Sequence, residues 1–447
     1  MSVDHNHPLT GHRWWFILPL LVFLVLVSAC QDPADGDEEP TGTTTIVEAS
    51  PEQSVRPEMA TEAAYPPSVE TRAPDPYPVS GTPTPTRTPR PGDSGTTVAN
   101  YPVEAYLPLI EKPVAPAPTP TRKPTETPTP TIDFRAVRAQ LQAQGQDLGF
   151  AKIGFHAGIG GNRTGLGEWM GRLDATGVPF FVKSVDDAGP LLEAQQIVRD
   201  SDTPHILVFR RSGNEYDTPN YDLPPEEAAR QHWQLHMEAF PSELDPSLVW
   251  LETLNEVDKG RSEWLGSFAL ETARLAMADG FRWAAFGWSS GEPEATDWQA
   301  PSMSAFLRLA AANPDRLAIA LHEYSFSIDD IADQYPFKLG RFLLLYQVTD
   351  QLGLPRPTVL ITEWGWEYQD IPSVEQALRD IDWAAAMYAA YPEVKGAAIW
   401  YLGIGFGDIA DQAQKLIAPV AEYSQGTYFA IPLPPDRAPV DPESYRP

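Results

Sequence analysis

Two short stretches of the chain place a carboxylate at the end of an apolar run. Residues 359–366 read Val-Leu-Ile-Thr-Glu-Trp-Gly-Trp, so Glu363 follows four β-prone residues and is followed closely by Trp364 and Trp366. A buried strand that carries one acid into an aromatic surrounding suits chemistry on a sugar. A strand end whose acid caps a helix would give the same pattern. A second carboxylate is needed to decide between these interpretations.

The second stretch, residues 248–256, reads Leu-Val-Trp-Leu-Glu-Thr-Leu-Asn-Glu and ends on Asn255-Glu256. Glycosidic cleavage needs one protonated carboxyl group for the leaving oxygen and one ionised group for the anomeric carbon. Two carboxylates in one low-dielectric site repel, which lets one of them keep its proton near neutral pH. Asn255 and Glu256 have opposite strand parity, so both face one site only if a bulge or strand end intervenes. Glu252 shares the parity of Glu256 and is the alternative acid; we interpret it as structural.

The elements that position these residues alternate between short apolar runs and amphipathic stretches. Strands are predicted at 152–156, 179–183, 205–210, 248–255, 282–287, 317–322, 358–363 and 396–400. Helices are predicted near 165–176, 188–200, 223–240, 260–279, 300–312, 333–352, 373–391 and 409–423. The strands are apolar on both sides, as buried parallel strands are. Eight such units predict a (β/α)₈ TIM barrel rather than an open doubly wound sheet.

In this fold the chemistry lies at the carboxyl ends of the strands. The residues predicted there are His156, Lys183, Arg210, Asn255, Glu256, Trp288, His322, Tyr324, Glu363 and Trp400. For His156, Lys183 and Arg210 the sequence leaves open whether they contact a substrate or pair with neighbouring acids. Trp288, Trp298, Trp364 and Trp366 are predicted to lie in loops past strand ends, where their rings would be available to stack on sugars. At least one of the four is expected to belong to the core instead, and Trp288, Trp364 and Trp366 are the predicted substrate-binding residues.

The order of these elements resembles that of the clan A retaining glycoside hydrolases. The resemblance rests on Asn255-Glu256 after strand 4, the stretch His322-Glu323-Tyr324 after strand 6, Glu363 on strand 7 and Trp400 on strand 8. It covers residues 150–405 by element order, although not by residue identity. An arginine that several of these families carry on strand 2 or 3 has no clear counterpart.

The resemblance implies a role for each matched residue. Glu256 would be the general acid/base and Glu363 the nucleophile, with their carboxyl groups roughly 5–5.5 Å apart. Asn255 would hold a sugar 2-hydroxyl group, and Tyr324 would donate a hydrogen bond to Glu363. Trp400 would form the floor of the sugar site, and His322 would be a further substrate-binding residue.

Composition divides the chain into three parts. Residues 31–132 hold about half of the 47 prolines, a composition that disfavours a packed core and favours a disordered, extended linker. Residues 133–447 hold most of the 13 tryptophans and form the one predicted domain. The net charge of −29 argues against a nucleic-acid partner.

Residues 1–30 are predicted to be a signal peptide. An apolar run from Trp14 to Ala29 follows Arg13, and the segment Val27-Ser28-Ala29-Cys30 resembles the lipobox of bacterial lipoproteins. That resemblance implies cleavage before Cys30 and its acylation, which would tether the protein to the cell membrane outside the cytoplasm. An uncleaved signal anchor with an incidental cysteine is the alternative.

The function predicted from the sequence is that of a retaining glycoside hydrolase that cleaves O-glycosidic bonds of a β-linked oligo- or polysaccharide by double displacement. No cofactor is expected, and no metal, because the sequence has no HExxH motif and no clustered His/Asp set. The expected partners are the carbohydrate and the membrane, and we expect a monomer. The alternative function is a non-catalytic carbohydrate-binding lipoprotein on a TIM-barrel scaffold, against which the presence of both Glu256 and Glu363 argues.

Overall fold

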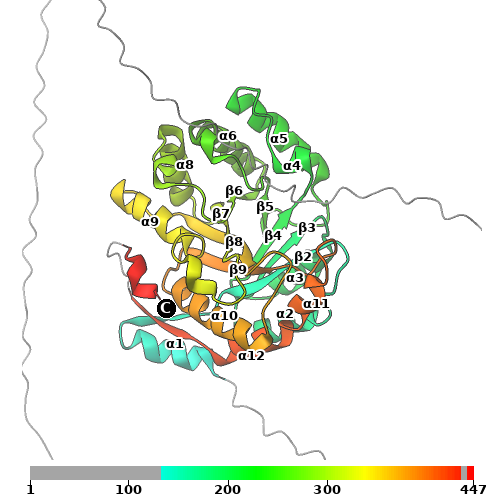
Figure 1. The fold of residues 1–447 in the computed structure, drawn as a ribbon, viewed down its shortest axis with the longest axis vertical. Helices are drawn as coiled ribbons and strands as arrows, with labels where there is room; N and C mark the ends of the chain where they lie inside the picture. Colours follow the sequence, from blue (N-terminus) through cyan, green and yellow to red (C-terminus); the bar gives the residue numbers. More distant parts are fainter. Residues whose placement is uncertain (1–131, 434–439, 447) are drawn as a thin grey trace, which may run out of the picture. The chain divides into compact units, whose positions relative to one another are not determined.

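The computed structural model describes residues 132–433 and 440–446, so the predicted signal peptide, Cys30 and almost all of the predicted linker lie outside the described residues. At its centre eight parallel strands form a closed barrel in chain order, with the last strand paired to the first (Figure 1). The strands are β2 (Ile153–Gly158), β3 (Phe181–Val185), β4 (Ile206–Arg210), β5 (Val249–Glu252), β6 (Arg282–Trp288), β7 (Leu317–Tyr324), β8 (Thr358–Gly365) and β9 (Val394–Trp400). The predicted (β/α)₈ barrel is confirmed.

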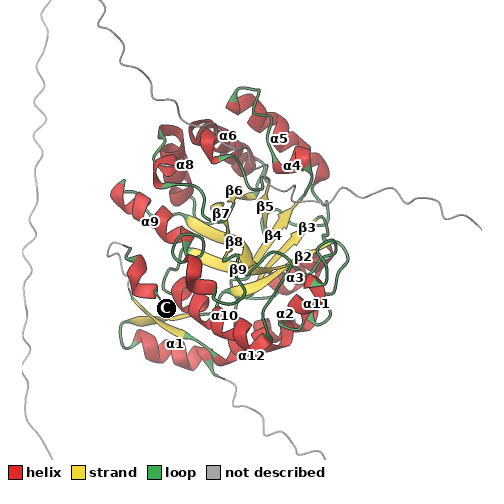
Figure 2. Ribbon diagram, in the orientation of Figure 1, coloured by secondary structure: helices red, strands yellow, loops and turns green. Residues whose placement is uncertain are grey.

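Helices surround the barrel (Figure 2). The longer ones are α2 (Leu166–Ala175), α3 (Gly189–Arg199), α5 (Pro225–Ala239), α6 (Ser262–Ala278), α8 (Pro301–Ala312), α9 (Arg341–Gln351), α10 (Val374–Ala389) and α12 (Ile417–Gly426). Shorter pieces are α4 (Asn214–Asp217), α7 (Ala295–Trp298), α11 (Ile409–Gln414), η1 (Lys259–Arg261), η2 (Ile331–Gln334) and η3 (Pro442–Tyr445). Within the described ranges, no helix has the length and hydrophobicity that a membrane crossing would require.

The short pieces α4, α7 and η3 were not predicted from the sequence, and neither were three elements outside the barrel, α1 (Phe134–Gln142), β1 (Gln146–Gly149) and β10 (Phe429–Pro432). Helix α1 and strand β1 precede the barrel, and β1 pairs antiparallel with β10 near its end. Phe134 packs against Phe150, just before β2 begins, with ring centroids 5.4 Å apart. This small sheet therefore lies at the amino-terminal face of the barrel, where β2 starts.

The barrel interior is built in layers. The apolar layer consists of Phe181, Val208, Trp250, Ala284, Ala318, Ala320, Leu360 and Ala398, which are all buried. Because strand side chains alternate between faces, the next inward position on several of these strands is polar. These polar residues are Lys183, Arg210, Glu252, His322 and Thr362. The apolar layer thus forms the base on which the polar side chains stand.

Candidate active site

Glu363 lies on β8 and points into the barrel because of a β-bulge. Leu360 faces the interior, so strict alternation would turn Thr362 inward and Glu363 outward. The pairing of β8 with β7 shifts between Leu321 and His322, and Glu363 pairs with His322, leaving Thr362 as the extra residue. A bulge of this kind re-aims the following side chain. Both Thr362 and Glu363 therefore contact interior groups.

The Glu363 carboxylate is largely buried and is surrounded by donors and cations. Its neighbours are Tyr324 Oη, which donates to Oε2 at 2.8 Å, Lys183 Nζ at 3.2 Å, Arg210 Nη2 at 3.6 Å, His322 Nδ1 at 3.7 Å and His156 Nδ1 at 3.9 Å. Burial alone would raise the pKa of Glu363, but the positive charges around it hold that pKa well below its usual range. The carboxylate is therefore ionised at neutral pH.

His156 does not supply one of these charges. Its side chain is buried, and burial together with Lys183 lowers the pKa of His156 well below its usual value. The neutral imidazole packs edge-on against Tyr401, with ring centroids 5.0 Å apart. The ionised Glu363 is thus balanced by Lys183, Arg210 and His322.

A second, fully buried acid lies beneath Glu363. Glu252 Oε2 is 2.7 Å from Lys183 Nζ, and Thr362 Oγ1 donates to Glu252 Oε1 at 2.7 Å. Burial would raise the pKa of Glu252, but Lys183 and then His322 bring it down to about 2. Lys183 therefore bridges two carboxylates, Glu252 and Glu363. Its role is ion pairing, one of the alternatives that the sequence left open.

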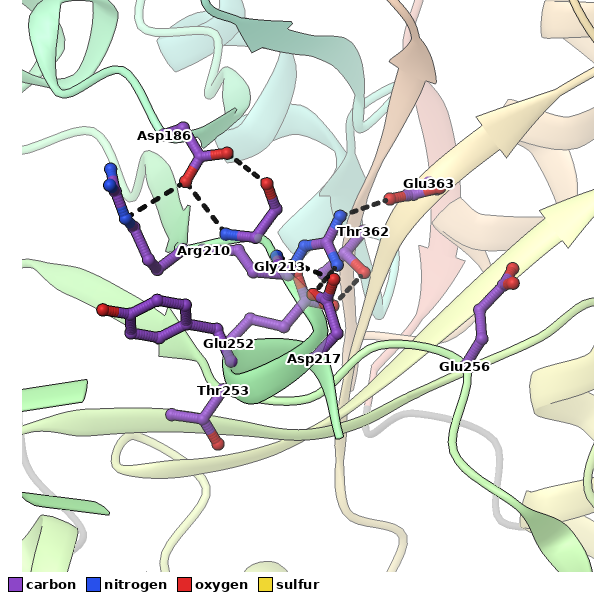
Figure 3. A network of polar contacts seen from close by, with 12 residues as sticks. Asp186, Arg210, Gly213, Asp217, Glu252, Thr253, Glu256, Thr362 and Glu363 are labelled. Atoms are coloured by element: carbon purple, nitrogen blue, oxygen red, sulfur yellow. Dashed lines mark hydrogen bonds and ion pairs between the residues drawn. The ribbon is translucent and has the colours of Figure 1, made fainter. Parts of the chain in front are cut away.

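Arg210 has the same arrangement on the neighbouring strand. Its Nη1 lies 2.7 Å from Asp217 Oδ1 and its Nη2 lies 3.6 Å from Glu363 (Figure 3). Asp217 belongs to α4, in the loop that follows β4. The barrel begins at β2, so β4 is its third strand, and Arg210 lies on it beside the predicted nucleophile Glu363. The sequence alone offered no clear counterpart for the arginine that several clan A families carry on strand 2 or 3.

Glu256 reaches the site from a loop, because β5 ends at Glu252 and not near Asn255 as predicted. Glu256 has φ of 47°, a conformation that is costly for a residue with a side chain. Its backbone N–H donates to Gly287 O at 2.7 Å, and the N–H of Asn255 donates to Asp217 O at 3.0 Å. These bonds hold the strained loop in place, and the strand end required by the opposite parity of Asn255 and Glu256 is confirmed.

Gly287 is one reason why β6 comes so close to this loop. A Cβ atom at position 287 would lie 2.8 Å from the carbonyl oxygen of Leu254. Gly287 also has φ of 54°, which disfavours residues with side chains. A glycine here therefore permits the hydrogen bond between Gly287 O and Glu256 N.

His322 lies between the two predicted catalytic carboxyl groups. Its Nδ1 is 3.3 Å from Glu256 Oε1 and 3.7 Å from Glu363 Oε2. These two oxygens are consequently no farther apart than the sum of those distances, about 7 Å. The separation of roughly 5–5.5 Å between the carboxyl groups stays a prediction. Burial alone would lower the pKa of His322, but Glu363, Glu252 and Glu256 raise it to about 9. The imidazole is therefore a cation at neutral pH.

Three tryptophans predicted to be free for sugar stacking are part of the core. Trp288 and Trp364 are 0% exposed and Trp366 is 1% exposed. Strands β6 and β8 run further than predicted, so Trp288 and Trp364 lie within strands. Trp366 donates its indole N–H to Asp380 on α10 at 2.6 Å. With no ring face open to solvent, the prediction that these three side chains stack on sugars is wrong.

Trp400 and Asn255 are half-buried. The Trp400 ring stands edge-on to Tyr324, with centroids 6.1 Å apart. Asn255 Oδ1 is buried and accepts no hydrogen bond from the described residues. No cluster of His, Cys, Asp or Glu side chains suited to a metal ion occurs in residues 132–433 or 440–446.

Sequence reasoning recognised Glu252 only as an alternative acid and did not identify the partners of Lys183. Both residues interrupt apolar strands, in Phe-Phe-Val-Lys and in Val-Trp-Leu-Glu. A charge embedded in a buried strand must find a counter-charge, so this pattern is the signal that could have paired them.

Two buried histidines on α5 hold the loop that carries Asn255 and Glu256. The Nε2–H of His232 donates to Thr253 O at 2.7 Å, and that of His236 donates to Tyr216 O at 3.1 Å. Burial lowers the pKa of His232 to about 4 and that of His236 to about 3. Both imidazoles are neutral in the folded protein at neutral pH.

The chain was compared with known proteins. No protein-family model and no curated protein matches it. Among solved structures it is similar to the endo-beta-1,4-glucanase Xac0029 from Xanthomonas axonopodis pv. citri, with 12% identity and a TM-score of 0.34 over 61% of this chain and 99% of the glucanase. XacCel5A gives 14% identity and a TM-score of 0.33 over 61% of this chain and 99% of its own. A putative fructose-1,6-biphosphate aldolase from Coccidioides immitis gives 8% identity and 0.29, over 66% and 94%. Likenesses this distant carry no argument about function, which must come from the site residues.

The Lys183 bridge leads to a stability prediction. Lys183→Met leaves Glu252 and Glu363 buried without their shared cation, so the free energy of unfolding should fall by about 3–5 kcal/mol. The double variant Lys183→Met/Glu252→Gln removes one charge of each sign and should recover much of that loss. Arg379→Met, which breaks the exposed pair with Glu375, serves as the control and should cost less than about 1 kcal/mol. Urea titrations at pH 7 measure all three, and a double variant less stable than Lys183→Met would contradict the bridge.

The α5 histidines lead to a prediction of pH dependence. Their folded pKa values lie below the unfolded value near 6.5, so the unfolded chain binds more protons as the pH falls. Their contribution to stability is present above pH 6.5 and is lost as the pH falls toward about 4 and about 3. His232→Gln keeps a donor for Thr253 but does not titrate. The loss of unfolding free energy between pH 6 and 4.5 should therefore be smaller in this variant, by about 1.4 kcal/mol per pH unit. An unchanged slope would show that His232 does not titrate as described.

Proposed function

We propose that the protein is a retaining glycoside hydrolase that cleaves O-glycosidic bonds by double displacement. The observation that carries this proposal is the convergence of Glu256 and Glu363 on one imidazole, His322, at the carboxyl end of the barrel. Glu363 lies on β8 and Glu256 on the loop after β5, and the two carboxyl groups differ in surroundings. Glu363 is buried among cations, whereas the Glu256 side chain is 39% exposed. Such a division suits one ionised nucleophile and one group that exchanges protons.

In the first step a carboxylate oxygen of Glu363 forms a bond to the anomeric carbon. The bond from that carbon to the leaving oxygen breaks, and Glu256 gives its proton to this oxygen. In the second step water attacks the anomeric carbon, Glu256 takes a proton from the water, and the ester to Glu363 breaks. The cations around Glu363 favour its ionised form. Glu363 needs this form to attack the anomeric carbon in the first step, and it returns to it when the ester breaks in the second.

Other residues support these steps. Tyr324 donates to Glu363 Oε2 and fixes the direction of the carboxylate. The buried Oδ1 of Asn255 is an acceptor for a sugar hydroxyl group, and a bond to the 2-hydroxyl strengthens in the transition state. Half-buried Trp400 offers an apolar floor for the sugar ring.

The catalytic assignment is tested with a panel of aryl β-glycosides. Glu363→Gln should abolish turnover, because an amide cannot form the ester, and Glu256→Gln should lower kcat about 10²–10⁴-fold. NMR of the first-formed product should show the same anomeric configuration as the substrate. Inversion would refute double displacement. If the wild type and Glu363→Gln are equally inactive but both still bind sugar, the alternative of a non-catalytic carbohydrate-binding protein is favoured.

We further propose that the protein is a lipoprotein held at the outer side of the cell membrane. The support is the apolar run that ends in Val27-Ser28-Ala29-Cys30. In a bacterial host, Cys30→Ser should prevent acylation and move the protein from the membrane fraction to the soluble fraction or leave its signal peptide uncleaved. Mass spectrometry of the mature amino terminus distinguishes these results, and an unmodified Cys30 in a membrane-bound wild type would contradict the proposal.

A further inference from the structure

Four aromatic side chains beside the candidate active site are joined by successive ring contacts. Phe326 and Tyr324 are nearly parallel, with centroids 6.1 Å apart and an angle of 19°. Tyr324 meets Trp400 edge-on at 6.1 Å, and Trp400 lies nearly parallel to Tyr368 at 6.0 Å and 25°. We call these four residues the aromatic strip. Tyr324 connects the strip to the candidate active site, because it donates a hydrogen bond to the Glu363 carboxylate.

The outer members of the strip are exposed. Phe326 is 50% exposed and Tyr368 is 54% exposed. The ring centroids of Tyr368 and Trp400 are 6.0 Å apart. Tyr368 is the more exposed of the two, so it is the member of this pair that a ligand can reach from solvent. At the other end, Lys338 Nζ lies 4.0 Å over the Phe326 ring and helps to hold it.

The strip belongs to an apolar arc of the barrel mouth. Five of the eight exposed large apolar side chains among the described residues lie in loops that follow β7, β8, β9 and β2. They are Ile159, Phe326, Phe337, Tyr368 and Ile404. These four strands are neighbours in the closed barrel, and the loops after β3 to β6 contribute none. The loops of the arc are joined by hydrogen bonds from Phe326 N to Trp366 O and from Ile404 N to Ile159 O.

We propose that the aromatic strip binds successive units of a neutral glycan chain, with Phe326 and Tyr368 each contacting a unit beyond the one that reacts at Glu363. This inference rests on the proposed function and adds two specificity-determining residues to it, Phe326 and Tyr368, which together require a chain of at least three units. Sugar rings present apolar C–H faces that match exposed aromatic rings, while their hydroxyl edges stay hydrated. The net charge of −29 disfavours anionic glycans.

A protein partner fits the strip less well. Tyr324, one member of the strip, donates a hydrogen bond to Glu363, so the strip adjoins the carboxylate that would react. This contact favours the molecule on which Glu363 acts as the occupant of the strip.

The test compares long and short substrates. Neutral β-linked gluco-, manno- and xylo-oligosaccharides of two to six units are measured beside an aryl β-monoglycoside. In Phe326→Ala and in Tyr368→Ala, the ratio of kcat/KM for the longest hydrolysed oligosaccharide to that for the monoglycoside should fall about tenfold. Tyr368→Phe keeps the ring and should retain the ratio.

Tyr428→Ala is the matched control. Tyr428 is 41% exposed but directly precedes β10, away from the mouth, so its removal should leave the ratio unchanged. The strip would be overturned, and the proposed hydrolysis left intact, if Phe326→Ala and Tyr368→Ala both kept the same ratio of kcat/KM values as Tyr428→Ala. If the wild type hydrolyses nothing yet binds the oligosaccharides with an affinity that depends on Tyr368, the hydrolase proposal fails and the strip stands. A wild-type protein that neither hydrolyses nor binds the oligosaccharides of the panel would overturn both the proposed hydrolysis and the aromatic strip.

Discussion

The compensation of buried negative charge is the constraint on which the candidate site depends. Glu363, Glu252 and Asp217 are acids that the fold withdraws from water, and each faces a cation at close range. Withdrawing a carboxylate from water costs several kcal/mol unless counter-charges and hydrogen bonds replace the lost solvation. Lys183 and Arg210 each contact two acids, so removing either would leave more than one charge unbalanced. The site is therefore one electrostatic unit and not a set of separate pairs.

The barrel makes this unit possible. Parallel strands bring residues that are distant in the chain to the same height, so Lys183, Arg210 and Glu252 meet above one apolar layer of Phe181, Trp250 and small residues. Two local irregularities then adjust the geometry. The bulge in β8 turns Glu363 inward, and the early end of β5 releases Glu256 onto a loop. Each departure from regular strand structure serves one of the two carboxyl groups.

The sequence predicts the barrel well, because eight buried strands at regular spacing have few other solutions. It also identifies Glu256, Glu363, His322 and Tyr324 as residues at strand ends, and the structure brings them together. It does not predict the burial of Trp288, Trp364 and Trp366, because strand ends are uncertain by a few residues and a shift of that size decides exposure.

The two outer members of the aromatic strip were missed for a related reason, although Tyr324 and Trp400 were predicted as site residues. Phe326 and Tyr368 lie in loops without periodic sequence patterns, so nothing in the sequence marks them as exposed. In the sequence, only the charges of Lys183 and Glu252 distinguish these two residues from the other residues of their strands. Which charge meets which depends on the register of β3, β4 and β5, and this register follows from closure of the whole barrel rather than from any local pattern.

The pairing of β1 with β10 has a consequence for the two faces of the barrel. This sheet and α1 lie at the amino-terminal face, so residue 132, where the described chain begins, is on the face opposite the strand end that carries Glu363. A ligand that lay along the aromatic strip would therefore occupy the face of the barrel opposite residue 132.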